Sequence, residues 1–198
     1  MLSNSPIVVT APASKPVTLA EAKLFLREDL VDTANDNQIQ MLLDAAIEHV
    51  EGQTSRRLIT QTLRCFNGGW PRGVFRFPVG PISAISHVRY YDTNDVQYTL
   101  PSTEYSFDGT SNPPVLGLNY LRTWPSVTLR PLNPVEIQFV AGYPDAAAVP
   151  ARLKNAILMI LATLYRHRPT VTVGNSAAIA SLIPHHFTAF LESNRIHA

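Results

Sequence analysis

The chain has 198 residues, of which 45% are hydrophobic and 16% charged, with a formal net charge of +1. This length suits one domain, or one domain with an insertion, and the composition can fill a core. A net charge near zero gives no global reason to expect binding to nucleic acid or to a membrane.

The charge is uneven along the chain. Residues 1-60 carry five Lys/Arg against eight Asp/Glu, residues 61-142 six against five, and residues 143-198 five against two. Ends of opposite sign suit head-to-tail stacking of unlike surfaces. The single Cys65 excludes an intrachain disulfide and a cysteine zinc site. Because residues 1-16 lack the features of a signal peptide, we expect folding in the cytoplasm.

The first 60 residues predict an arm and two helices. Residues 1-16 are predicted to form an N-terminal arm, with a β-like run at 7-9 that needs a neighbour to hold it. The next segment, 17-60, is predicted to hold both helices. Thr18 and Glu21 have capping-box spacing and mark the start of the first. Its apolar face is predicted to contain Leu19, Ala22, Leu26 and Leu30.

The second helix is predicted to follow a polar break at residues 32-36, and its pattern can continue to Leu58. Asp44, Glu48 and Glu51 recur at i, i+4 and i+7 on its polar side, which is typical of a solvated face. The opposite side carries an apolar stripe: Ile39, Leu42, Leu43, Ala46, Ile47 and Val50.

Residues 61-144 are predicted to form a β insertion, because ten of the sixteen prolines lie between Pro71 and Pro144 and the apolar runs become short. Residues 92-95 predict a hairpin turn. Residues 135-140 alternate as a half-buried strand does, whereas 84-91 do not alternate cleanly. The predicted strands are 62-66, 74-77, 84-91, 96-100, 105-107, 115-118 and 135-140.

The segment 145-169 is predicted to contain the core helix, from Ala151 to Arg168. Nine of the ten residues from 156 to 165 are apolar, so this helix is predicted to be buried with no exposed side. Its apolar part is far shorter than the roughly 20 residues of a membrane span.

Residues 170-198 are predicted to form a flexible linker and a short terminal helix. The helix opens at Ile183-Pro184 and carries Phe187, Phe190 and Leu191 on one side. In all, the sequence predicts a single α+β subunit: a helical bundle of three to four helices, an inserted antiparallel β region and an extended C-terminal tail.

Residues for chemical catalysis are not apparent. The stretch Gly68 to Gly73 lacks the spacing and the Lys-Ser/Thr of a phosphate-binding loop, and there is no nucleophile elbow or zinc-binding helix motif. His185 and His186 are adjacent, so they would project about 100° apart on a helix, and we interpret them as polar residues of a helix start. No catalytic, cofactor-binding or metal site is predicted.

One ordered series of short motifs spans nearly the whole chain: Pro16 to Lys23, Leu26-Arg27, Ala45-Ala46 to Glu51, Thr54, Arg56, Leu58 to Thr60, Phe77-Pro78, Pro81-Ile82, Val88, Tyr90 to Asp92, Ala141 to Tyr143, Pro150, Ala156-Ile157, Tyr165, Arg168, Ile183-Pro184, Leu191 and Arg195. In their order and spacing these motifs resemble the head-tail connector, or adaptor, proteins of tailed bacteriophages and of phage-like particles such as gene transfer agents. The family usually has glycine where Ser55 stands, glycine in the hairpin where Asn94-Asp95 stands, and Leu-Leu where Phe190-Leu191 stands.

The resemblance implies a structural role and no enzymatic activity. Such connectors form a ring, usually of twelve copies, under the portal protein, extend the DNA channel, and join the head to a stopper or tail-completion protein. It therefore implies a location at the head-tail interface of a particle, a homo-oligomer, and duplex DNA that passes without sequence-specific contact. It implies no cofactor and no membrane.

Two hypotheses follow for particular residues. The tail is a candidate portal-docking arm, with Ile183, Phe187, Phe190, Leu191 and Arg195 as docking residues; alternatively, its helix packs back on its own bundle.

The second hypothesis is that Asp44, Glu48 and Glu51 face the DNA channel, where like charge keeps the duplex from sticking; alternatively, they form a solvated face. Two other functions stay open: a DNA-end-binding packaging factor, which needs a basic groove or an acidic metal cluster, and a receptor-binding β module of a tail, which could use Trp70 and Trp124.

Overall fold

The computed structural model describes residues 5–167 and 191–196. The chain forms two compact units. We call residues 14–58 and 145–195 the helical unit, and residues 1–13, 59–144 and 196–198 the β unit. Helices and antiparallel sheets thus occupy separate parts of the chain, which confirms the predicted α+β class.

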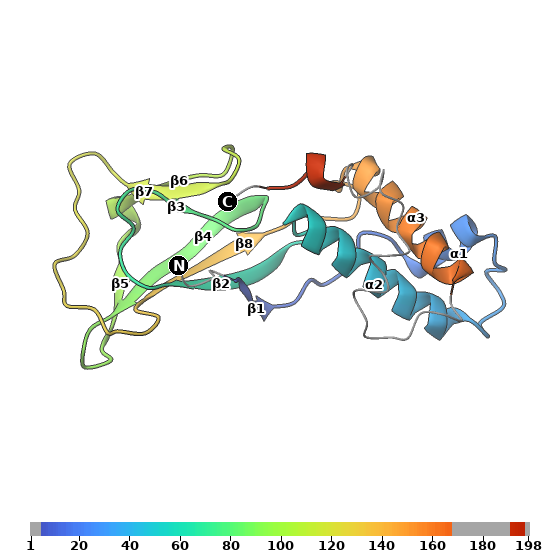
Figure 1. The fold of residues 1–198 in the computed structure, drawn as a ribbon, viewed down its shortest axis with the longest axis horizontal. Helices are drawn as coiled ribbons and strands as arrows, with labels where there is room; N and C mark the ends of the chain where they lie inside the picture. Colours follow the sequence, from blue (N-terminus) through green and yellow to red (C-terminus); the bar gives the residue numbers. More distant parts are fainter. Residues whose placement is uncertain (1–4, 168–190, 197–198) are drawn as a thin grey trace. The chain divides into compact units, whose positions relative to one another are not determined.

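In the described residues of the helical unit, the main helices are α1 (Leu19–Leu26), α2 (Asp36–Thr54) and α3 (Ala151–Arg166) (Figure 1). Each of them packs against the other two. The predicted stripe of α2 is confirmed, since five of its six residues are buried and Ile47 is half-buried.

The start of α1 is the predicted capping box. The Glu21 backbone N–H donates to Thr18 Oγ1 at 3.2 Å, and the Thr18 backbone N–H donates to Glu21 Oε2 at 2.7 Å. The backbone hydrogen bond from Thr18 lowers the pKa of Glu21. The helix ends at Leu26, and Arg27 has a left-handed backbone with φ 61°. Leu30 therefore lies beyond the helix and is exposed, so the prediction that it belongs to the buried face is wrong.

The end of α2 comes earlier than the pattern allowed. Ser55 has a left-handed backbone, with φ 53°, and turns the chain out of the helix three residues before Leu58. Leu58 is nevertheless fully buried. Only glycine adopts this backbone at no cost, which accounts for the glycine that the connector family usually has here.

The apolar run of α3 is buried on one side only. Six of its residues are buried, yet Met159 is 44% exposed. The prediction of a helix with no exposed side is wrong, because α1 and α2 cover one face and leave the opposite apolar residues accessible to solvent.

Two antiparallel sheets build the β unit. In the first, the strands follow the order β1-β2-β8-β4-β5, and in the second the order β3-β7-β6. A short 3₁₀ helix, Ser102–Glu104, precedes β6. The strands are β1 (Ile7–Thr10), β2 (Gln61–Asn67), β3 (Phe75–Arg76), β4 (Ile82–Tyr91), β5 (Gln97–Leu100), β6 (Tyr105–Asp108), β7 (Val115–Leu118) and β8 (Val135–Ala141).

Register shifts explain the irregular pattern of β4. Its pairing with β8 shifts between Ile82 and Ala84 and again between Ile85 and His87. Each bulge adds one residue and reverses the facing of the side chains that follow, so no clean alternation survives in the sequence.

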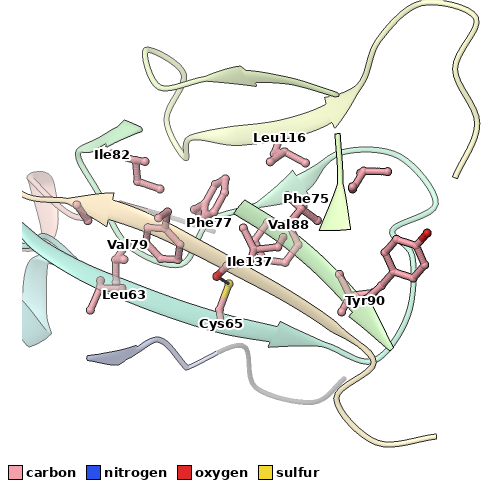
Figure 2. Close-up of a cluster of buried hydrophobic side chains, with 14 residues drawn as sticks. Leu63, Cys65, Phe75, Phe77, Val79, Ile82, Val88, Tyr90, Leu116 and Ile137 are labelled. Atoms are coloured by element: carbon pink, nitrogen blue, oxygen red, sulfur yellow. Dashed lines mark hydrogen bonds between the residues drawn. The ribbon is translucent and has the colours of Figure 1, made fainter. Parts of the chain in front are cut away.

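The core of the β unit lies between the strands of both sheets. Figure 2 shows Phe77 close to Ile82, Val79 and Ile137, with Leu63 and Cys65 entering from β2. Phe77 stacks edge-to-face on Phe139, with ring centroids 4.9 Å apart.

The hairpin at 92–95 is confirmed: Asp92 Oδ1 accepts from the backbone N–H of Asn94 at 2.8 Å. Asp95 in this hairpin has a left-handed backbone, with φ 61°.

Thr60 and Tyr143 lie beside each other although they are 83 residues apart in the sequence. The Thr60 backbone N–H donates to the Tyr143 carbonyl at 2.9 Å, and the Thr60 hydroxyl donates to the same oxygen at 2.8 Å. Gly142 has φ 113°, and a Cβ atom there would lie 2.3 Å from the Ile59 carbonyl oxygen. Glycine is therefore required at this junction.

Candidate functional site

The three acidic residues of α2 have different surroundings. Asp44 is exposed, and its Oδ1 lies 2.5 Å from Nζ of Lys15, also in the helical unit, in an exposed ion pair. Gln40 Nε2 also donates to this oxygen, at 3.2 Å. The Asp44 carboxylate is thus partly neutralised, although exposed ion pairs of this kind contribute under about 1 kcal/mol.

Glu51 is a structural residue of the turn after α2. Its side chain is 16% exposed; Oε2 lies 3.0 Å from Arg57 Nη1, and Oε1 accepts from the Leu58 backbone N–H at 2.8 Å. Both oxygens are therefore engaged in the turn that follows Ser55.

Glu48 is exposed, and no hydrogen bond or ion pair of its carboxylate occurs within residues 5–167 and 191–196. The row of three acids therefore presents one unengaged carboxylate, one exposed ion pair and one structural turn contact. Residue spacing alone gave no sign of Lys15 or Arg57 as partners.

Most of the candidate tail residues lie outside the described residues, namely Ile183, Phe187 and Phe190, as do His185 and His186. Leu191 is fully buried within the helical unit, and Arg195 is exposed. Arg56 Nε donates to the Asn194 carbonyl at 2.8 Å, so residues 191–195 are tied to the end of α2. The candidate docking residues thus include one that contributes to the core of its own unit.

Lys23 organises the connection between α1 and α2, a role that the sequence reasoning missed. Its residue is 3% exposed, and Nζ donates to the carbonyls of Asp32 at 2.5 Å and Leu30 at 3.3 Å. Nζ also lies 2.7 Å from Asp36 Oδ1. A buried ammonium with carbonyl and carboxylate partners fixes the path of the chain between the helices. The available signal was a lysine at i+4 from Leu19, on the apolar face of α1.

Glu136 in β8 is another buried charge that the sequence reasoning placed wrongly. The alternation predicted a half-buried strand with Glu136 on the wet side, yet the residue is 5% exposed because β8 is the central strand. Its Oε1 lies 3.3 Å from His87 Nε2 and 3.9 Å from Arg89 Nη1. The Arg89 guanidinium on β4 supplies the opposing charge, and the His87 imidazole lies within hydrogen-bonding distance of the same oxygen.

The aromatic residues of the β unit serve packing. Trp70 stacks on Trp124 at 4.7 Å and meets Tyr90 edge-to-face at 5.1 Å, and Trp124 Nε1 donates to the Pro71 carbonyl at 3.0 Å. Tyr90 and Tyr98 are cross-strand partners, and their rings stack with centroids 5.2 Å apart. The two tryptophans pack against the core and against each other, which leaves them poorly placed as an open platform for a sugar.

Within the part of the chain that the structure describes, no three His, Cys, Asp or Glu residues are grouped closely enough to hold a metal ion. None of the helices described is long and apolar enough to span a bilayer.

Comparison with known proteins gives structural matches only. No family model matches the sequence, and no curated protein matches it either. A chain in the neck of an empty gene transfer agent (GTA) particle, computed with C6 symmetry, is similar with a TM-score of 0.76 and 23% identity over 98% of this chain and 96% of that one.

Two other solved structures contain similar chains. One in the virion of a native GTA particle gives a TM-score of 0.74 with 22% identity, covering 98% of this chain and 96% of that one. One in the neck of a native GTA particle, computed with C12 symmetry, gives 0.65 with 22% identity and 96% of both chains. This chain therefore has, over nearly its whole length, the fold of chains found in GTA particles and their necks.

Proposed function

We propose that this chain is a structural neck subunit, a head-tail connector of a tailed phage or of a phage-like particle such as a gene transfer agent. The observation that carries the proposal is the fold match over 98% of this chain and 96% of a neck chain, with a TM-score of 0.76. The two tryptophans stack on each other and pack against the core, and the described residues hold no metal-binding group, so neither rival function gains support. No enzymatic role is proposed.

The proposed subunit folds in the bacterial cytoplasm and forms a ring beneath the portal protein. There it extends the channel for duplex DNA and joins the head to a stopper or tail-completion protein. Support for a ring comes from neighbours whose neck structures were computed with C6 and C12 symmetry. In this proposal residues 1–198 form one connector subunit, with residues 61-144 as its β insertion.

Electron microscopy tests the proposal. Purified full-length chain is mixed with portal-bearing heads that lack a neck, and we expect an added ring beneath the portal. Heads that gain no ring would refute the connector role, and tight binding of the chain to a glycan or to DNA ends at physiological salt would favour one of the rival functions.

The channel hypothesis now centres on Glu48, since Asp44 and Glu51 have partners of their own. In the assembled ring, Glu48→Lys places a cation where the phosphates pass, and we expect slowed DNA ejection with normal ring assembly. Glu192→Lys makes the same charge change at an exposed position outside α2 and is the matched control. Ejection at the normal rate in the Glu48→Lys particle would exclude Glu48 from the channel wall.

The portal-docking hypothesis is best tested at Arg195, because a truncation would also remove the buried Leu191. Arg195 is exposed, so Arg195→Glu should preserve the fold while weakening attachment to portal-bearing heads. Attachment equal to that of the unmodified chain would remove Arg195 from the docking residues. Circular dichroism of the variant checks that the helical unit is intact.

A further inference from the structure

The connection between α1 and α2 exposes four large apolar side chains. Leu24, Phe25, Leu30 and Val31 are 62%, 41%, 49% and 86% exposed. We call these four residues the α1–α2 patch. Large exposed apolar side chains that lie close together mark an interaction surface more often than single exposed residues do.

The patch is held in place before any partner arrives. Lys23 Nζ binds the carbonyls of Leu30 and Asp32, and the Val31 backbone N–H donates to Asp29 Oδ1 at 2.9 Å. The Ala34 backbone N–H donates to Asp32 Oδ1, also at 2.9 Å. A surface that is already ordered loses little conformational entropy when it binds.

Acidic residues surround this patch. Between Leu26 and Thr33 the chain carries Glu28, Asp29 and Asp32 against the single cation Arg27. Glu28 Oε1 accepts from the Tyr165 hydroxyl at 2.6 Å, a neutral donor, and no described cation lies within ion-pair distance of Asp29 or Asp32. The patch is therefore apolar with an acidic rim.

The outer face of α3 has the complementary character. Arg152, Met159 and Arg166 are exposed and seven residues apart, so they follow one line along the helix, with Asn155 beside it. No acidic residue occurs in α3, and within the described ranges no carboxylate pairs with Arg152 or Arg166. This face presents an apolar centre with a cation at each end.

We propose that the α1–α2 patch of one copy docks on the outer face of α3 in the next copy. The proposal rests on the ring proposed above and names its subunit contact. Like charge opposes pairing of two patches or of two α3 faces, whereas the unlike surfaces attract. A contact between unlike surfaces is heterologous, and such contacts close into rings when the rotation between copies permits.

Disulfide trapping between copies tests the contact. Val31→Cys and Met159→Cys chains are made separately at full length; Cys65 is buried and gives no background. Both sites are exposed, so both variants should fold. Oxidation of the mixed variants should give covalent dimers, and neither variant alone should give them. A chain with both substitutions should give a ladder of multimers.

Two outcomes would overturn the proposal. Dimers from Val31→Cys alone would show a symmetric patch-to-patch contact, and a mixture that stays monomeric under oxidation would show that the two surfaces do not meet. Because trapping accumulates even transient pairs, weak association of the isolated chain does not hide the result.

A charge exchange gives an independent measurement. In the proposed contact, Val31→Lys places a cation against the basic face of α3, and Met159→Glu places a carboxylate against the acidic rim. Because like charges repel, each variant alone should lower self-association, measured by sedimentation velocity, at least several-fold. The double variant should recover it, because the new charges attract across the interface. Loss without recovery would contradict direct contact.

These tests separate the contact from the connector role. Trapped dimers from a chain that adds no ring to portal-bearing heads would uphold the contact and refute the connector role. A ring beneath the portal whose copies cannot be trapped through these positions would do the reverse.

Discussion

At the residue scale, Cys65 is a thiol that burial makes inert. It lies in β2, fully buried in the core of the β unit, with Sγ 3.8 Å from the Ile137 carbonyl oxygen. Burial raises its pKa to about 12, and the nearby Glu136 carboxylate adds to this effect. Since the thiolate is the reactive form, the folded protein should hold almost none of it at neutral pH.

We expect iodoacetamide to leave the native chain unlabelled at pH 8 and to label it once in denaturant, as counted by mass spectrometry. The exposed thiol of Val31→Cys should react at once under native conditions and serves as the positive control. Stoichiometric native labelling of the unmodified chain would contradict the buried position of Cys65.

His49 on α2 makes the stability of the helical unit depend on pH. Its Nε2 is buried without a hydrogen-bond partner in the described structure, and burial lowers its pKa below the ordinary value of 6.5. The unfolded chain therefore binds a proton at a pH where the folded chain does not. The contribution of neutral His49 to the free energy of unfolding is fully present above about pH 6.5 and is lost as the pH falls through the lowered pKa of the folded state.

Urea unfolding between pH 8 and pH 5 measures this effect. The unmodified chain should lose stability on acidification, and His49→Gln should lose less over the same range, because it has no proton to bind. A variant that loses stability as steeply as the unmodified chain would assign the pH dependence to other groups.

At the element scale, the α1–α2 connection depends on Lys23. Lys23→Met keeps the length of the side chain but leaves two carbonyls and the Asp36 carboxylate without their cation. Removing one partner of a buried ion pair costs a few kcal/mol, and since Asp36 is partly exposed we expect about 2–4 kcal/mol here. Urea unfolding followed by circular dichroism at 222 nm measures this loss of unfolding free energy.

Lys15→Met is the matched control for this prediction. It removes an ion pair of the same helix, with Asp44, whose partners are both about half exposed. Such a pair should contribute under about 1 kcal/mol. Equal effects of the two variants would mean that Lys23 has no special role in the connection.

The same element shows what the sequence can and cannot predict. The capping box at Thr18 and the stripe of α2 were predictable because each depends on residues a few positions apart. The cation of Lys23 was not, since its partners are backbone carbonyls seven and nine residues away. Nor was the burial of Glu136, which follows from the position of β8 at the centre of the sheet.

The candidate site was predicted less completely than the fold. The row of Asp44, Glu48 and Glu51 was found from its spacing on α2, but the partners that distinguish the three come from Lys15 and from the turn at Arg57. The exposure of one face of α3 could not be predicted, because the helix is apolar along most of its length. A run of apolar residues indicates burial equally in a subunit core and in a contact between subunits.

At the scale of the whole molecule, negative charge is concentrated near the N-terminal end of the sequence and positive charge near the C-terminal end. In the structure, part of each charge lies on one of the two proposed contact surfaces. The net −3 of residues 1–60 includes the acidic rim of the α1–α2 patch, and the net +3 of residues 143–198 includes the outer face of α3. Electrostatic attraction between copies should therefore assist assembly.

Self-association of the isolated chain should weaken as sodium chloride is added, because the screening length falls from about 30 Å at 0.01 M to about 3 Å at 1 M. Sedimentation velocity across this range measures the change. Association that strengthens with salt would indicate a contact dominated by apolar burial, with no contribution from the rim.

The hydrogen bonds between Thr60 and Tyr143 have an implication for how such a molecule can be altered. The chain enters and leaves the long segment 61–141 at adjacent positions, and the close packing of Gly142 against Ile59 allows no side chain there. Recombination that exchanges residues 61–141 would thus replace most of the β unit without changing the sequence of the helical unit, provided that Gly142 is retained and the new strand still pairs with β1. Laboratory chimaeras can be spliced at the same place.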